Sequence, residues 1–152
     1  MKRIQIIFLL MFVISFSRAQ VLINEYSAAN FDSYLDNYNE YEDWIELYNS
    51  SSNSIDLNGW YISDRASNPM KWSFTSSYII PANGVAVIFC SSRDEIIGNN
   101  AHTNFKLTQT KNNEKIILSD PAGTIVDSVD LIPNLTSHSR GRETNGSINW
   151  SV

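Results

Sequence analysis

The sequence holds a single cysteine, Cys90, among its 152 residues. One cysteine cannot form a disulfide within the chain, so the stability of the fold has to come from its packed core. Cys90 closes the apolar run Val85–Cys90, and free cysteine is among the residue types most often buried. We therefore expect a buried thiol here; a reactive thiol or an intermolecular disulfide is the alternative.

Long hydrophobic runs are also missing, apart from one near the N-terminus. Ile4–Ile14 is apolar but for one Gln, whereas a membrane-spanning helix needs about 20 apolar residues. Two basic residues precede this run, and Ser17-Arg18-Ala19 places small residues where a signal peptidase reads them. The pattern predicts a signal peptide over residues 1–19, cleaved before Gln20. The mature chain would then have no membrane span and would be secreted, periplasmic or held at the cell surface.

Basic residues are scarce in the expected mature chain, residues 20–152. Removal of Lys2, Arg3 and Arg18 leaves eight basic residues against sixteen acidic ones, a net charge of −8. Such a chain repels phosphate backbones, so we expect no nucleic-acid partner. The largest basic patch is the tripeptide Arg140–Arg142, and we expect its two arginines to bond backbone carbonyls or nearby acids.

Helical periodicity is rare, and short β-rich runs alternate with Asn, Ser, Gly and Pro. About eight or nine strands at these intervals predict a single all-β domain, an antiparallel β-sandwich. The expected strands are Val21–Tyr26, Asp43–Asn49, Ile55–Leu57, Trp60–Ser63, Lys71–Phe74, Val85–Cys90, Phe105–Leu107, Lys115–Leu118 and Ile125–Val129. We expect Val85–Cys90 to be a central strand buried on both faces, and the tail from Pro133 to Gly146 to be a polar loop.

Within the second expected strand, Ile45 and Leu47 alternate with polar and aromatic residues, so one face should point into the core. Trp44 and Trp60 sit in such alternating strands and should also fill the core. The other two tryptophans, Trp72 and Trp150, are not placed by the pattern and leave a sugar-stacking role open.

A set of motifs in a fixed order resembles the lamin tail domain in its bacterial, secreted form. The motifs are Asn24-Glu25, Glu42–Asn49, Asp56–Asp64, Lys71–Phe74, Ile80–Gly84, His102–Leu107, Asn113–Leu118 with Val126-Asp127, and Ser139–Arg142. The resemblance implies an immunoglobulin-like sandwich. It implies no activity: in nuclear lamins the domain is an interaction module, and in bacteria it usually accompanies other exported domains, including hydrolases and kinase-like domains.

Motifs for catalysis are absent from the sequence. It has no Gly-x-Ser-x-Gly elbow and no glycine-rich phosphate loop, and its few His and Cys residues are too scattered for a zinc site. We therefore expect a monomeric, non-enzymatic interaction or scaffolding domain with a protein or glycan partner. The alternative is an accessory module of a larger extracellular enzyme, truncated here. Three glycosylation sequons occur, at Asn49, Asn134 and Asn145.

The acid-rich stretch from residue 30 to 43 raises the question of calcium. An EF-hand loop starting at Asp32 fails, because its third and sixth positions are Tyr34 and Asn37. A looser site that joins Glu25, Asp43 and Glu46 would supply the oxygen ligands that calcium prefers. The alternative is an acidic loop that only faces water. No other cofactor is expected.

Overall fold

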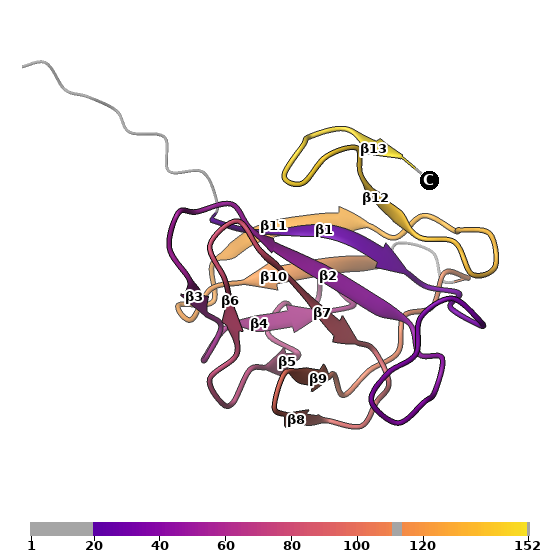
Figure 1. Ribbon diagram of the computed structural model, residues 1–152, viewed down its shortest axis with the longest axis horizontal. Helices are drawn as coiled ribbons and strands as arrows, with labels where there is room; N and C mark the ends of the chain where they lie inside the picture. Colours follow the sequence, from indigo (N-terminus) through magenta and orange to yellow (C-terminus); the bar gives the residue numbers. More distant parts are fainter. Residues whose placement is uncertain (1–19, 111–113, 152) are drawn as a thin grey trace, which may run out of the picture.

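The computed structural model describes residues 20–110 and 114–151, and every regular element in these two ranges is a strand (Figure 1). The strands are β1 (Val21–Ser27), β2 (Trp44–Asn49), β3 (Ile55–Asp56), β4 (Tyr61–Ser63), β5 (Trp72–Ser73), β6 (Ile79–Ile80), β7 (Val85–Phe89), β8 (Glu95–Ile97), β9 (Asn100–His102), β10 (Lys115–Ser119), β11 (Ile125–Asp130), β12 (Arg140–Arg142) and β13 (Trp150–Ser151). The predicted signal peptide over residues 1–19 lies outside the described residues.

Two sheets form the layers of a β-sandwich. The larger has the order β13-β12-β1-β2-β7-β9-β8, and the smaller has the order β11-β10-β4-β5. A short ladder of β3 and β6 lies at one end of the sandwich (Figure 1). All pairings are antiparallel except that of β7 with β9. The predicted all-β, immunoglobulin-like sandwich is thereby confirmed.

The core fills the space between the two sheets. In β2 the buried residues Ile45 and Leu47 alternate with half-buried ones, as the sequence predicts. Ile88 of β7 and Leu118 of β10 are fully buried as well, and they join the same core cluster. Each such side chain contributes about 1.5–3 kcal/mol relative to exposure. Cys90 is buried in this cluster, and burial raises the pKa of its thiol, which keeps the thiol protonated.

An ion pair closes the open edge of β1. The β12 partners of β1 begin only at Glu25, which leaves Ile23 without a neighbouring strand on that side. Its N–H donates to Asp127 Oδ2 of β11 at 2.9 Å, and its carbonyl accepts from Arg142 Nε of β12 at 2.8 Å. Arg142 Nη2 and Asp127 Oδ2 lie 3.0 Å apart and both side chains are largely buried. These contacts join both sheets at a single backbone residue.

Asn49, at the end of β2, fastens the ladder of β3 and β6 to the larger sheet. Its Nδ2 lies 2.8, 3.1 and 3.0 Å from the carbonyl oxygens of Asn53, Ile80 and Pro81. Its Oδ1 accepts from the N–H and the hydroxyl of Ser51. The side chain is fully buried, so all of its polar atoms are used inside the protein.

The structure corrects several of the predicted strands. Val85–Cys90 is not buried on both faces, because Val85 is 42% exposed on the outer face. Phe105–Leu107 forms no strand, although both end residues are buried. The tail predicted to be a loop includes β12, which joins the edge of the larger sheet. The two short strands β8 and β9 carry no recognisable alternation in the sequence.

The tryptophans are also placed differently from the prediction. Trp72 is the buried one, and its Nε1 donates to Asp94 at 2.9 Å. Trp44 and Trp60 are only half-buried; Trp44 lies on the outer face of β2, and Trp60 packs at the margin of the core. Along β2, Trp44 alternates with Ile45 and Leu47, so the pattern that buries those two residues places Trp44 on the opposite face, and the expectation that Trp44 fills the core is wrong.

Truncation of the buried ion pair should be costly. We expect Asp127→Ala to lower the free energy of unfolding by about 3–5 kcal/mol, since it leaves a buried guanidinium and the Ile23 N–H without their partner. The matched control is Asp130→Ala on the same strand, whose exposed pair with Lys115 should contribute less than about 1 kcal/mol. Urea unfolding measures both. Equal losses in the two variants would contradict the role given to Asp127.

Candidate partner-binding groove

A hollow of about 600 Å³ opens on the outer face of the larger sheet. We call it the β7 groove. It is bounded by the loop between β1 and β2, by β6 and the turn that follows it, by β7, and by the turn between β8 and β9. Its lining residues are Tyr34, Leu35, Asp36, Asn37, Tyr78, Ile79, Pro81, Val85, Ala86, Val87, Phe89, Asn99 and Asn100.

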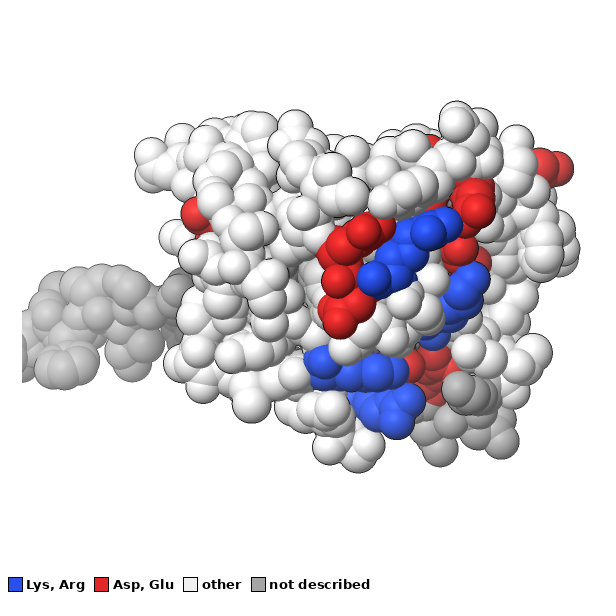
Figure 2. Space-filling view, turned by 90° about the horizontal axis from the view of Figure 1, so that it is seen from below, with Lys and Arg blue, Asp and Glu red and all other residues white. Residues whose placement is uncertain are grey.

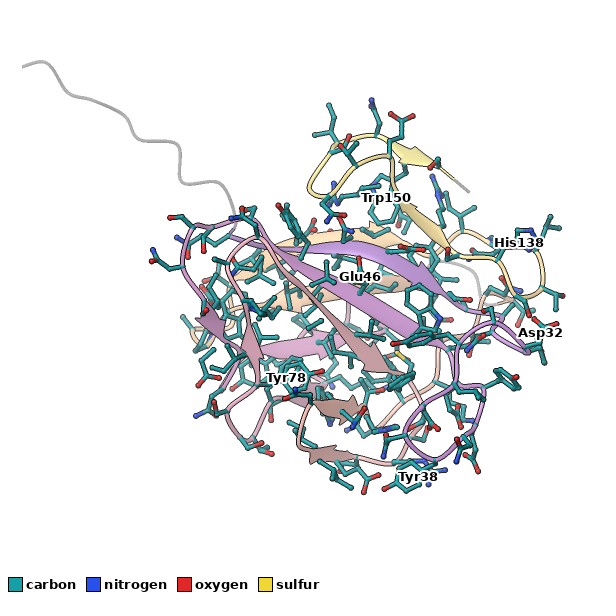
Figure 3. All side chains as sticks on the ribbon, viewed as in Figure 1. Asp32, Tyr38, Glu46, Tyr78, His138 and Trp150 are labelled. Atoms are coloured by element: carbon teal, nitrogen blue, oxygen red, sulfur yellow. The ribbon has the colours of Figure 1, made fainter. Side chains whose placement is uncertain are left out.

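The groove exists because β9 leaves β7 after two residues. The two strands pair only at Ile88 and Phe89, so the first half of β7 has no neighbour on that side. Tyr78 fills part of the gap: its hydroxyl lies 3.0 Å from the carbonyl oxygens of both Val87 and Asn99 (labelled in Figure 3). Burial raises the pKa of Tyr78 to about 12, so the phenol keeps its proton and joins β7 to the β8–β9 turn.

A run of aromatic rings builds one wall of the groove. Tyr34 stacks on Phe89, with ring centroids 5.8 Å apart, and its ring meets Trp44 edge-on. Phe89 in turn stacks on His102 at 5.2 Å. His102 is fully buried, and burial lowers its pKa, which favours the neutral ring. That ring donates from Nε2 to Asn37 Oδ1 at 2.7 Å and accepts from the Ser91 hydroxyl at Nδ1.

The loop that forms this wall is held by its own hydrogen bonds. Asp36 Oδ1 accepts from the N–H groups of Tyr38 and Glu40 at 2.8 and 2.9 Å, a turn that Asp stabilises in loops. Asn30 is buried, and its Nδ2 donates to the carbonyls of Tyr34 and Glu42. The groove therefore has a preformed wall.

Two of the five acids in residues 30–43 are paired with basic residues from elsewhere in the chain. Glu40 pairs with Arg93, and Glu42 pairs with Lys106 at 2.8 Å. Figure 2 shows the same arrangement on a larger scale, with acidic and basic side chains bordering one another over one face of the molecule. This stretch is thus neither a purely solvated loop nor an accumulation of free carboxylates.

The three candidate calcium ligands do not come together. Glu25 and Glu46 are cross-strand partners on the outer face, and Glu46 Oε1 accepts from Asn24 Nδ2 at 2.8 Å. Burial, with a contribution from Glu25, raises the pKa of Glu46. Asp43 precedes Glu46 by three residues, which directs its side chain to the opposite side of the sheet. No cluster of three His, Cys, Asp or Glu suited to a metal ion occurs within residues 20–110 and 114–151.

Asp43 instead packs beside Cys90. Its Oδ1 accepts from the N–H of Asn30 at 3.2 Å. Burial raises the pKa of Asp43 to about 6, and the neighbouring Glu42 raises it further than Lys106 lowers it. This carboxyl is a packing element of the loop, and calcium binding by the chain stays a prediction.

Sequence reasoning missed the residues that shape the groove. Tyr78 precedes the two-residue strand β6, which Ile79 begins, and nothing in the local pattern indicates that a tyrosine would bridge two carbonyls. The exposure of Val85 gives no signal in sequence either, because an apolar run is expected for a buried strand as much as for a binding surface.

Comparison with known protein families identifies the family to which this fold belongs. The chain matches the Lamin Tail Domain family over residues 15–132. It belongs to that family. The match includes β1 to β11, whereas β12 and β13 lie beyond it. A comparison with curated proteins found no relative. Lamin tail domains are a family of non-enzymatic immunoglobulin-like domains. The groove described above is lined mainly by apolar and amide side chains. None of the described residues forms a helix that is long and apolar enough to cross a membrane.

The buried carboxyl should make stability depend on pH. The folded pKa of Asp43, about 6, exceeds its ordinary value of 3.8, so the native state binds more protons between these values and stability falls as pH rises through this window. Asp43→Asn keeps the acceptor for Asn30 and removes the charge. We expect the variant to gain about 1–2 kcal/mol over the wild type at pH 7 and almost nothing at pH 3.5, measured by urea unfolding.

The exposed Asp32→Asn serves as the control for this experiment, because it changes the net charge equally at a position in the same loop. A gain that is the same at both pH values, or the same in the two variants, would show that the carboxyl of Asp43 is not the cause.

Calcium binding is tested by thermal melting. Because only Glu25 and Glu46 converge, we expect the melting temperature of this lamin tail domain to differ by less than about 1 °C between chelator and millimolar calcium. A rise of several degrees would support the calcium hypothesis. Glu25→Gln and Asp43→Asn would then show which carboxyl is involved.

Proposed function

We propose that this lamin tail domain is an exported, non-catalytic interaction domain that binds an extended, uncharged segment of a partner protein in the β7 groove. The proposal rests on the exposed apolar side chains that line this groove. Three of its aliphatic side chains are solvent-exposed: Leu35 of the loop between β1 and β2 at 44%, Ile79 of β6 at 53% and Val85 of β7 at 42%. Contiguous exposed apolar surface is typical of a binding site.

The chemistry of the lining favours a polypeptide. Its exposed apolar parts are three aliphatic side chains and the ring of Tyr34, which is 46% exposed, and the side-chain amides of Asn37, Asn99 and Asn100 can bond a peptide backbone. A glycan site is typically built on a free aromatic face. Here the ring of Phe89 lies between Tyr34 and His102, and Tyr78 is 5% exposed, so neither ring has a free face. Tyr34 has one face stacked on Phe89, which leaves at most one face for a sugar. A glycan is therefore the second choice.

The charge of the lining favours a neutral segment. Asp36 is the one charged residue that lines the groove, and its Oδ1 is used by two backbone N–H groups. The groove has no pairing of a nucleophile with a base among its lining residues, which supports a binding role over a catalytic one.

The exported state is supported by where the fold begins. β1 starts at Val21, one residue after the proposed cleavage point, so removal of residues 1–19 would leave all of the described strands intact. The edge strands of the larger sheet, β8 and β13, are short and offer little backbone for pairing with another chain, which favours a monomer as far as this sheet is concerned. Attachment to an extracellular enzyme as an accessory module is the alternative, and the groove would serve that role equally.

The experiment is selection from a displayed library of random peptides on the purified domain. We expect enriched peptides with alternating aliphatic residues and few charges. Val85→Asp should weaken their binding at least tenfold, because it places a carboxylate on the apolar floor. Ile125→Asp, on β11 and 51% exposed, adds the same charge away from the groove and should leave binding unchanged.

Two outcomes would overturn the proposal. One is a failure to enrich any peptide, and the other is enriched peptides that bind both variants equally. A neutral oligosaccharide whose binding is lost in Val85→Asp would assign the groove to glycans instead.

A further inference from the structure

Arg140 stands apart from the other basic side chains. Residues 20–110 and 114–151 contain seven Lys and Arg residues, and six of them form an ion pair with Asp or Glu. Arg140 is the exception in these ranges. Its guanidinium makes no hydrogen bond to a described residue, and its Nε is buried without an acceptor. In an acidic protein an unneutralised arginine is unexpected, because carboxylates outnumber cations.

Arg140 lines a pocket of about 250 Å³ between β11, β12 and β13. The other lining residues are Ser128, Val129, Asp130, Ile132 and Trp150. We call it the Arg140 pocket. It lies at one border of the larger sheet, whereas the β7 groove lies towards the other, and the labels of Trp150 and Tyr78 in Figure 3 mark the two positions.

The walls of the pocket are fixed by contacts to the core. The Trp150 ring lies 6.0 Å from Tyr26, a fully buried core residue. The guanidinium carbons of Arg140 and Arg142 lie 5.9 and 5.0 Å from the Trp150 ring centre. Ile132 is held because its N–H donates to the Tyr26 hydroxyl at 3.0 Å. The free guanidinium is thus presented beside an immobilised aromatic wall.

The one acid in the pocket is engaged elsewhere. Asp130 pairs with Lys115, its cross-strand partner on β10, and forms no ion pair with Arg140. Arg142, two residues along β12, has Asp127 as its partner. Among the described residues Arg140 therefore has no acceptor for its Nη donors and no acid to neutralise it, which leaves its guanidinium available to a ligand.

We infer that the Arg140 pocket binds one carboxylate group of an acidic polypeptide segment, such as the side chain of a glutamate. A guanidinium matches a carboxylate with two parallel N–H···O bonds. The volume suits a single side chain, and Val129, Ile132 and Trp150 offer apolar surface for its methylene groups. The inference does not depend on the function proposed for the β7 groove.

The pocket is less suited to other anions. One free cation balances the single charge of a carboxylate, whereas a phosphate monoester carries nearly two. A sugar acid has several hydroxyls that need partners, and besides Arg140 the lining offers only the polar groups of Ser128 and Asp130 and the indole N–H of Trp150. The balance of charge and polarity thus selects a carboxylate on an apolar stem.

The test uses two capped pentapeptides, Ala-Val-Glu-Val-Ala and its Gln counterpart, with inorganic phosphate and glucuronate as further probes. Each is titrated into the purified domain while the indole N–H signals are followed by NMR. We expect saturable shifts of the Trp150 signal with the Glu peptide and at least tenfold weaker binding of the Gln peptide. The Arg140→Gln variant should bind the two peptides with equal affinity. In the wild type, added salt should reduce the difference in affinity between them.

Arg93→Gln is the matched control, because Arg93 is paired with Glu40 on a distant loop and its loss should leave the titration unchanged. A melting temperature of Arg140→Gln near that of the wild type shows that the pocket is still folded, and Arg140→Lys serves as the second variant if it is not. Equal shifts with both peptides, or shifts that persist in the Arg140 variant, would overturn the inference. Tighter binding of phosphate or glucuronate than of the Glu peptide would overturn the choice of a polypeptide.

Discussion

The buried pair of Asp127 and Arg142 sets the geometry on which the rest of this lamin tail domain depends. β1 lies between β12 and β2, but β12 does not reach Ile23, so the backbone groups of Ile23 on that side have their partners in two side chains. These side chains come from β11 of one sheet and β12 of the other. The contact therefore determines how the two layers meet, and it holds β12 where its other arginine reaches the Arg140 pocket.

The same principle, a backbone edge completed by a side chain, produces the β7 groove. Where β9 leaves β7, the exposed carbonyl of Val87 is bonded by Tyr78. A strand in that position would have placed its own side chains beside those of β7 and filled the hollow. A single phenol satisfies the backbone and leaves the face open. Both candidate sites thus arise where regular pairing in the larger sheet ends.

Much of the fold could be predicted from the sequence, because its signals are local. The alternation of Ile45 and Leu47 identified the core face of β2, and the burial of Cys90 followed from its residue type. The order of motifs indicated the family. Errors arose where burial depends on distant residues: Val85 has the composition of a buried strand, and Trp72 gives no sign of being more buried than Trp44.

The sites were less predictable than the fold. Arg140 and Arg142 are nearly adjacent in sequence, and the expectation that both would bond carbonyls or acids is confirmed for Arg142 but is wrong for Arg140. The two arginines differ because Asp127 of β11 pairs with Arg142, whereas Asp130 of the same strand pairs with Lys115 and forms no ion pair with Arg140. Likewise, the spacing of Glu25, Asp43 and Glu46 did not reveal that a strand directs Asp43 and Glu46 to opposite faces.

The enclosed side chain of Asn49 bears on how a host could modify this protein. Of its three sequons, the one at Asn49 has an amide nitrogen that faces three carbonyl oxygens, and its side chain has no exposed surface. An oligosaccharide on that nitrogen would displace a donor that holds the ladder of β3 and β6 to the larger sheet. In a cell that attaches such sugars during synthesis, transfer at this position and closure of the sandwich would exclude each other.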